Sequence, residues 1–100
     1  MQNIILSGLL LEDSEVKTDK NGHELIRFRL ACYDHDYAGK SQITIFKCIV
    51  RDPNYKNLKV DDMVFITGKL FITKLRDNID LIVNVFNINR GDGTDIKKFN

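Results

Sequence analysis

The sequence predicts an all-β fold in which a small, strongly curved sheet closes into a barrel. Strand-like runs, either alternating or continuously apolar, fill most of the 100 residues. Two of these runs carry a glycine near their centre, at Gly8 and Gly68. A lone glycine within a strand weakens it and usually marks a bulge or a sharp bend. Two such bends in one short all-β chain indicate a sheet that turns corners to meet itself.

The N-terminal part of the chain contains the first two predicted strands. Residues 3–11 form an apolar run around Gly8, and the polar segment that follows is interrupted by Val16, which can extend the sheet as an arm. Asn21-Gly22 then favours a hairpin turn, because both residues tolerate positive φ. Beyond the turn, residues 25–33 alternate between apolar and polar or charged side chains, as in a strand with one buried face.

Three more strands are predicted over residues 42–51, 63–75 and 79–89. Residues 34–41 form a loop, and Asp52-Pro53 ends the third strand because proline cannot donate to a ladder. The segment 54–60 is expected to form one or two helical turns. Strict alternation in the last strand predicts one face with Leu81, Val83 and Val85, and another with Ile82, Phe86 and Ile88. Residues 1–90 thus form one domain, followed by a short flexible C-terminal tail at 91–100.

Five strands with a short helix between the third and the fourth are the layout of the OB-fold, a Greek-key barrel. Other small five-stranded barrels, such as SH3-like ones, show a comparable pattern. The position of the helix and the long, bent first and fourth strands favour the OB-fold.

Several segments resemble, in order and spacing, those of the bacterial single-stranded DNA-binding proteins. They are residues 3–8, 13–16, 21–22, 28–31, 47–50 and 62–70. The resemblance covers residues 3 to about 88. It implies an OB-fold, a homodimer or homotetramer, and sequence-tolerant binding of single-stranded DNA. It also implies work in DNA replication, repair, recombination or plasmid maintenance in the bacterial cytoplasm, associated with the nucleoid.

The chain departs from this family where the family contacts its ligand. Ile45 and Arg51 stand where third-strand aromatic residues are usual, Leu75 lies at the tip of the fourth strand, and tryptophan is absent. The family's acidic tail, which recruits repair and replication enzymes, is replaced by the basic ending Lys97-Lys98-Phe99-Asn100. The resemblance therefore supports the fold better than it supports the ligand contacts. Replication or primosome proteins remain open as partners.

Binding of single strands needs cations along the phosphates and flat side chains under the bases. The candidate phosphate contacts are Arg27, Arg29, Lys47, Arg51 and Lys69, with Lys74 and Arg76 at the hairpin beyond. The candidate stacking residues are Tyr33, Tyr37 and Phe71, with Ile45 on the same face and Tyr55 as a further ring from a loop. Two plainer interpretations stay open: alternating cations often form only a solvated strand face, and Phe71 or Ile45 can lie in a subunit interface.

Charge and motifs limit the other functions. The net charge is only +1, so a nucleic-acid site requires the positive charge to be gathered on one face. Cys32 and Cys48 sit in apolar runs and are expected to be reduced core residues. His23 and His35 lack partners at metal spacing, so no metal or other cofactor is expected.

No catalytic motif, secretion signal or membrane span is recognisable, so the chain is not expected to be an enzyme or to engage a membrane. Two rival functions remain. One is a primosomal-protein-like OB dimer that acts mainly as an adaptor for a helicase or loader. The other is a module that binds a protein or an oligosaccharide through the same face. Residues 3–11 are the expected site of self-association, because a long apolar edge strand is rarely left unpaired.

Overall fold

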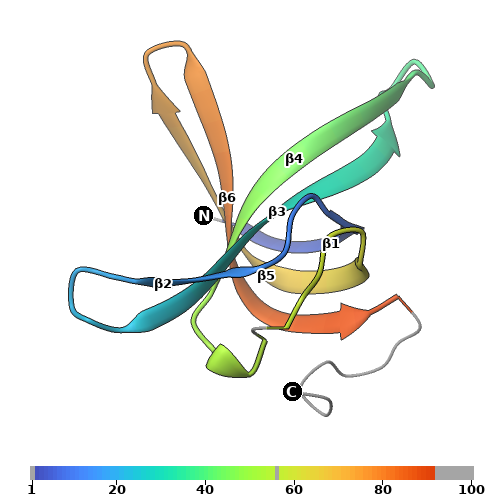
Figure 1. Ribbon diagram of the computed structural model, residues 1–100. Helices are drawn as coiled ribbons and strands as arrows, with labels where there is room; N and C mark the ends of the chain where they lie inside the picture. Colours follow the sequence, from blue (N-terminus) through green and yellow to red (C-terminus); the bar gives the residue numbers. More distant parts are fainter. Residues whose placement is uncertain (1, 56, 92–100) are drawn as a thin grey trace.

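The computed structural model describes residues 2–55 and 57–91, which form a six-stranded sheet and one short 3-10 turn (Figure 1). The elements are β1 (Gln2–Leu10), β2 (Glu15–Thr18), β3 (Glu24–His35), β4 (Ser41–Val50), η1 (Pro53–Tyr55), β5 (Met63–Leu75) and β6 (Asn78–Arg90). Five of these strands match the predicted runs, and β2 is the arm expected at Val16. Apart from Gly91, the predicted C-terminal tail lies outside the described residues.

The sheet closes into a barrel because β1 has a strand partner on each side. The strand order is β1-β5-β6-β4-β3-β2, and β1 also pairs with β3 at Leu9↔Ala31 and Leu10↔Leu30. The pairing of β4 with β6 is parallel, whereas the other pairings are antiparallel. Strand β2 continues the sheet outside the closed ring, beside β3. The result is a closed five-stranded barrel, consistent with the predicted OB-fold.

Gly8 and Gly68 lie where the backbones of two strands approach too closely for a side chain. A Cβ on Gly8 would lie 2.4 Å from the carbonyl oxygen of Ala31, and one on Gly68 would lie 2.4 Å from that of Asn84. The register also shifts between Thr67 and Gly68, which is the signature of a bulge. The predicted bends are confirmed, and close approach of two backbones explains why glycine stands at each.

The bulge corrects the predicted alternation of β6. Thr67 pairs with Asn87 and Gly68 with Val85, so Phe86 is the extra residue of the bulged strand. The side chains change phase there, and Ile88 is buried in the core together with Val85. The prediction that Ile88 shares the outer side with Phe86 is therefore wrong.

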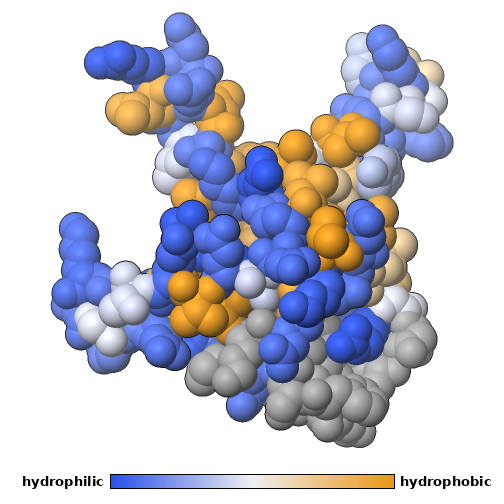
Figure 2. Space-filling model, in the orientation of Figure 1, coloured by the Kyte–Doolittle hydropathy of each residue, from blue (hydrophilic) through white to orange (hydrophobic). Residues whose placement is uncertain are grey.

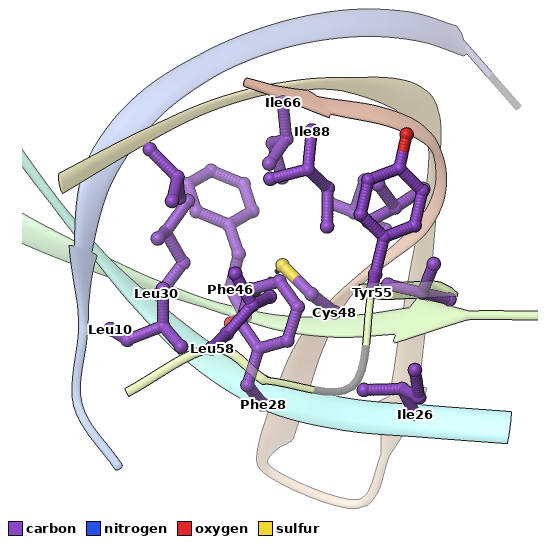
Figure 3. Close-up of a cluster of buried hydrophobic side chains, with 14 of the residues drawn as sticks. Leu10, Ile26, Phe28, Leu30, Phe46, Cys48, Tyr55, Leu58, Ile66 and Ile88 are labelled. Atoms are coloured by element: carbon purple, nitrogen blue, oxygen red, sulfur yellow. Dashed lines mark hydrogen bonds between the residues drawn. The ribbon is translucent and has the colours of Figure 1, made fainter. Parts of the chain in front are cut away.

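Among the described residues, the barrel core consists of hydrophobic side chains, and it is closed at one end by the connection between β4 and β5 (Figure 3). Tyr55 and Leu58 from this connection are fully buried against strand residues such as Leu30 and Ile88. The Tyr55 hydroxyl donates a hydrogen bond to Oδ1 of Asn87 at 3.0 Å, which satisfies its polar end. Tyr55 therefore belongs to the core, and the expectation that its ring is available to a ligand is wrong.

The predicted helix between the third and fourth strands of the barrel does not form. In the described part of this connection there is only the 3-10 turn η1. The Asp52 carboxylate accepts the N–H of Asn54 at 3.0 Å, and the Asp52 carbonyl accepts the N–H of Tyr55 at 3.3 Å. These bonds make a tight turn that aims Tyr55 into the barrel. Burial of Tyr55 and Leu58 thus overrides the weak local preference for helix.

Cys32 and Cys48 are free, buried thiols, as expected for core residues. Burial raises the pKa of both, most strongly for Cys48. Within residues 2–55 and 57–91, no helix is long and apolar enough to cross a membrane. In the same part of the chain, no group of three His, Cys, Asp or Glu side chains is arranged to hold a metal ion.

Candidate nucleic-acid interface

The outward-facing side of β3, β4, β6 and β5, called here the outer face, gathers cations and an aromatic ring into two cross-strand rows. Paired residues of neighbouring strands point to the same side of a sheet, so the strand register defines each row. The first row is Arg29, Lys47, Ile82 and Phe71. The second row is Arg27, Ile49, Asn84 and Lys69. The prediction that these cations and Phe71 lie on one face of the sheet is thereby confirmed.

The outer face continues along the hairpin of β3 and β4, which projects from the barrel (Figure 1). Ala31 pairs with Ile45, and Tyr33 pairs with Ile43, so Tyr33 and Ile45 keep the same phase as Arg29 and Lys47. Tyr33, Ile43 and Ile45 are all exposed despite their apolar character. This arm therefore adds one ring and two branched aliphatic side chains to the cationic rows.

Tyr37 stands at the tip of the same hairpin and is fully exposed. Oδ1 of Asp36 accepts the N–H groups of Ala38 and Lys40, each at 2.9 Å, and Gly39 has a φ of 81°. The loop is therefore built by its own backbone and by Asp36, with no contribution from the tyrosine ring. Such a ring can contact a ligand without disturbing the fold.

The hairpin of β2 and β3 uses the same construction. Oδ1 of Asp19 accepts the N–H groups of Asn21 and His23, each at 2.9 Å, and Gly22 has a φ of 82°. The hairpin predicted from Asn21-Gly22 is confirmed, but only the glycine adopts positive φ. The hydrogen bond from the His23 N–H, with those from Asn21 and Arg51, holds the pKa of the Asp19 carboxyl below its ordinary value.

Lys74 and Arg76 are not brought together with the rows. Lys74 pairs with Ile79 and alternates with Thr73, so it points to the opposite side of the β5–β6 hairpin from Phe71. Arg76 forms the turn of that hairpin with a φ of 57°, which is an uncommon conformation for a residue with a side chain. Both cations lie on the second projecting hairpin, which stands apart from the β3–β4 hairpin in Figure 2.

Phe86 is an aromatic residue of this surface that was not among the predicted site residues. Its ring is 55% exposed, and the Nζ of Lys69 lies 5.9 Å from the ring centroid. At this distance a cation and a ring attract each other. The signal was present in the sequence, since Phe86 is in phase with Ile82. The bulge at Phe86, which brings it beside Lys69, is a tertiary feature that alternation does not show.

Three of the predicted cations are already paired with carboxylates. Arg29 Nε lies 3.0 Å from Oε1 of Glu12, and Lys47 Nζ lies 3.0 Å from Oδ1 of Asp80. Arg51, just after β4, reaches Oδ2 of Asp19 at 3.2 Å. Within the described residues, Arg27 and Lys69 form no ion pair. The positive charge of the outer face is thus partly neutralised by acids from other segments, in keeping with the low net charge.

An open pocket of ≈ 320 Å³ lies within the outer face, beside the β2 arm. Its lining joins cations, acids and apolar side chains: Glu12, Glu15, Arg27, Phe28, Arg29, Lys47, Cys48, Ile49 and Ile82. The pocket therefore reaches both rows. Its lining offers an anionic group three cations, Arg27, Arg29 and Lys47, together with the two carboxylates of Glu12 and Glu15.

The chain matches no protein-family model and no curated protein by sequence. Its fold is similar to that of a small single-stranded DNA-binding protein from Streptomyces coelicolor, with a TM-score of 0.71 and 22% identity. It is also similar to a Plasmodium falciparum single-stranded DNA-binding protein in complex with single-stranded DNA, with a TM-score of 0.63 and 21% identity. Each likeness covers 89% of this chain and 91% of the other. The resemblance predicted from the sequence is confirmed at the level of the fold.

Proposed function

We propose that this protein binds single-stranded DNA across its outer face with little sequence preference. The observation that carries the proposal is the pair of cross-strand rows, which set cations beside exposed rings over four adjoining strands. Arg27, Arg29, Lys47, Arg51 and Lys69 supply phosphate contacts. Tyr33, Tyr37, Phe71 and Phe86 supply stacking surfaces, and Ile45 supplies apolar contact. Stacking and phosphate contacts tolerate any base, because every base has a flat face and the same backbone.

The structural likeness supports the same ligand. The Plasmodium protein, whose fold matches over most of both chains, is in complex with single-stranded DNA. The proposal extends to a role in replication, repair, recombination or plasmid maintenance in the bacterial cytoplasm, because single strands are exposed in these processes. It does not include catalysis.

Neutralisation of one cation tests the proposal. Arg27→Gln removes a cation of the second row without breaking an ion pair in the described part of the chain. Lys59→Gln is the control for net charge, since Lys59 lies in the β4–β5 connection, outside the two rows, where it forms only a loose, exposed ion pair with Asp13 at 3.9 Å. We expect Arg27→Gln to weaken binding of a fluorescently labelled oligo-dT by about threefold to tenfold at low salt. Equal effects of the two variants would contradict binding at the outer face.

The open edge of β1 favours self-association, which we include in the proposal. One edge of β1 pairs with β5 from Gln2 to Leu9, but the other edge meets β3 only at Leu9 and Leu10. The backbone groups of residues 2–8 on that edge have no strand partner within the described structure. An unpaired edge invites a second strand, and a second copy of β1 across a two-fold axis supplies one.

The adaptor function is the second candidate, and exposed apolar side chains favour it. Ile72, Leu75 and Ile79 on the β5–β6 hairpin are all strongly exposed. A protein partner can cover them, whereas phosphates cannot. The two functions differ in one result: an adaptor retains its protein partner after Arg27→Gln and shows only weak, salt-sensitive binding to oligo-dT.

A further inference from the structure

Arg29 and Lys47 are an unfavourable pair in the bare barrel. They are direct cross-strand neighbours on β3 and β4, and like charges placed opposite each other destabilise a sheet. Both side chains are half exposed and line the same ≈ 320 Å³ pocket. Two cations on one pocket need an anion to compensate them. The protein supplies that anion from two different segments.

The compensating carboxylates lie on opposite flanks of the two cations. Glu12 comes from the segment between β1 and β2 and holds Arg29 at 3.0 Å. Asp80 comes from β6 and holds Lys47 at 3.0 Å. Asp80 precedes Ile82, the β6 neighbour of Lys47, by two residues and therefore points to the outer face. Each acid satisfies one cation and leaves the pocket between the cations open.

The two ion pairs, Arg29–Glu12 and Lys47–Asp80, contribute little binding free energy. The side chains of Lys47 and Asp80 are 54% and 44% exposed, and exposed pairs contribute little because water screens them. Glu12 is less exposed, and its Oε2 is buried with no hydrogen-bond partner in the described structure. A buried carboxylate oxygen without a donor offsets much of the gain from the pair with Arg29. Both cations can therefore exchange partners at low cost.

We propose that the pocket seats a phosphate of the DNA strand, and that Glu12 and Asp80 hold its cations until the phosphate replaces them. The inference rests on the proposed function and adds a specific subsite to it. Arg27 lies across from Glu15 of β2, which lines the same pocket, but it forms no ion pair in the described structure and is the cation that contacts the phosphate first. Arg29 and Lys47 then turn from their carboxylates to the phosphate. The two acids thereby lower the affinity for single strands below what the cations alone would give.

The test replaces Glu12 and Asp80 with the uncharged amides of the same shape. Glu12→Gln and Asp80→Asn are each expected to raise the affinity for labelled oligo-dT by about twofold to fivefold at about 50 mM salt, since an exposed ion pair contributes about 0.2–1 kcal/mol. The gain is expected to shrink at about 300 mM salt, because salt already weakens the ion pairs in the unmodified protein.

Two controls carry the same change of charge away from the subsite. Glu24→Gln changes the first residue of β3, which lies on the opposite side of the strand from Arg27 and Arg29. Asp61→Asn changes a turn residue with a φ of 69°, a conformation that asparagine also tolerates. Both variants raise the net charge by one, as the test variants do. A gain common to all four variants reflects net charge only and overturns the inference.

A double-mutant cycle shows whether Asp80 acts through Lys47. In a Lys47→Gln background, Asp80→Asn is expected to give less than half the gain that it gives alone. An equal gain in both backgrounds overturns the exchange of partners. A purely structural role of the acids predicts lower thermal stability and no gain in affinity, and this result also overturns the inference. If the unmodified protein binds oligo-dT and the Glu12→Gln and Asp80→Asn variants bind it with the same affinity, the inference is overturned. The proposed function is not affected by that result.

Discussion

Gly68 has no room for a side chain, because the backbone of the paired strand β6 comes too close to it at the bulge. A Cβ there would meet the Asn84 carbonyl oxygen at 2.4 Å, and backbone atoms cannot move aside as a flexible side chain can. We expect Gly68→Ala to lower the free energy of unfolding by about 1–3 kcal/mol. Thr67→Ala, at the exposed neighbouring position, is the control and is expected to change it by about 0.5 kcal/mol or less. Urea unfolding of the three proteins measures both, and a Gly68→Ala barrel as stable as the control would contradict the close approach.

Phe71 and Phe86 are the rings that lie within or beside the two cationic rows. They are 39% and 55% exposed, and Phe86 already lies beside Lys69. We expect each change to alanine to weaken oligo-dT binding by about tenfold, since a stacked base contributes about 1–3 kcal/mol. Phe65→Ala is the control, because Phe65 is similarly exposed on β5 but pairs with Ser7 and Asn89 outside the two rows. Fluorescence anisotropy measures the affinities, and equal losses for Phe65 and Phe71 would contradict stacking at the two rows.

At the residue scale, periodicity predicted which cations share a face but not which of them form ion pairs with carboxylates. The alternation of β3 and β4 is local, so Arg27, Arg29 and Lys47 could be placed together from the sequence. The ion pair of Arg29 joins it to Glu12, which belongs to another segment of the chain. The pairing of Lys47 with Asp80 needs the parallel contact of β4 with β6. Neither pairing has a signal in the spacing of residues.

The hairpins are the elements that shape the outer face, and the β5–β6 turn contains a strained residue. Arg76 has a φ of 57°, which costs a residue with a Cβ about 1–2 kcal/mol relative to glycine. After the extra entropy of unfolded glycine is subtracted, Arg76→Gly is expected to stabilise the fold by about 0.5–1 kcal/mol. Asp77→Gly is the control and is expected to destabilise it. Thermal unfolding distinguishes them, and a destabilised Arg76→Gly variant would show that the side chain contributes more than the strain costs.

The open edge of β1 is the element expected to join two copies of the chain. Ile5 is 78% exposed at the centre of that strand, so Ile5→Lys changes the edge without emptying the core. We expect this variant to shift the protein toward a smaller species in size-exclusion chromatography with light scattering. Val16→Lys, an equivalent change on the exposed β2 arm, is expected to leave the mass unchanged. An unmodified protein that is monomeric at about 50 μM would contradict pairing through β1.

Element by element, strands were predictable and the connection after β4 was not. Strand alternation and mid-strand glycines have a direct structural cause, so the five barrel strands and both bends agree with the sequence. The segment around Tyr55 and Leu58 has no periodicity of its own, and its conformation follows from the need to close the end of the barrel. The one or two helical turns expected over residues 54–60, which were used to favour the OB-fold, do not form for this reason.

On the scale of the whole molecule, the fold gathers positive charge on one face, although the composition is nearly neutral. A net charge of +1 conceals one surface where cations of three strands, β3, β4 and β5, adjoin exposed rings. The OB-like barrel supplies this surface and the hairpins that flank it (Figure 2). Glu12, Asp19 and Asp80 partly neutralise the cations proposed to bind DNA, so the proposed function predicts moderate rather than extreme affinity.

Titration of the unmodified protein into labelled oligo-dT tests the central claim most directly, with a hairpin duplex of equal length as competitor. We expect micromolar or tighter binding at about 50 mM salt, preference for the single strand, and a slope of about −3 to −4 in log affinity against log salt, because each of the five proposed phosphate contacts on a single strand contributes about −0.7. No binding at about 10 μM protein, or equal affinity for the duplex, would contradict single-strand binding by this face.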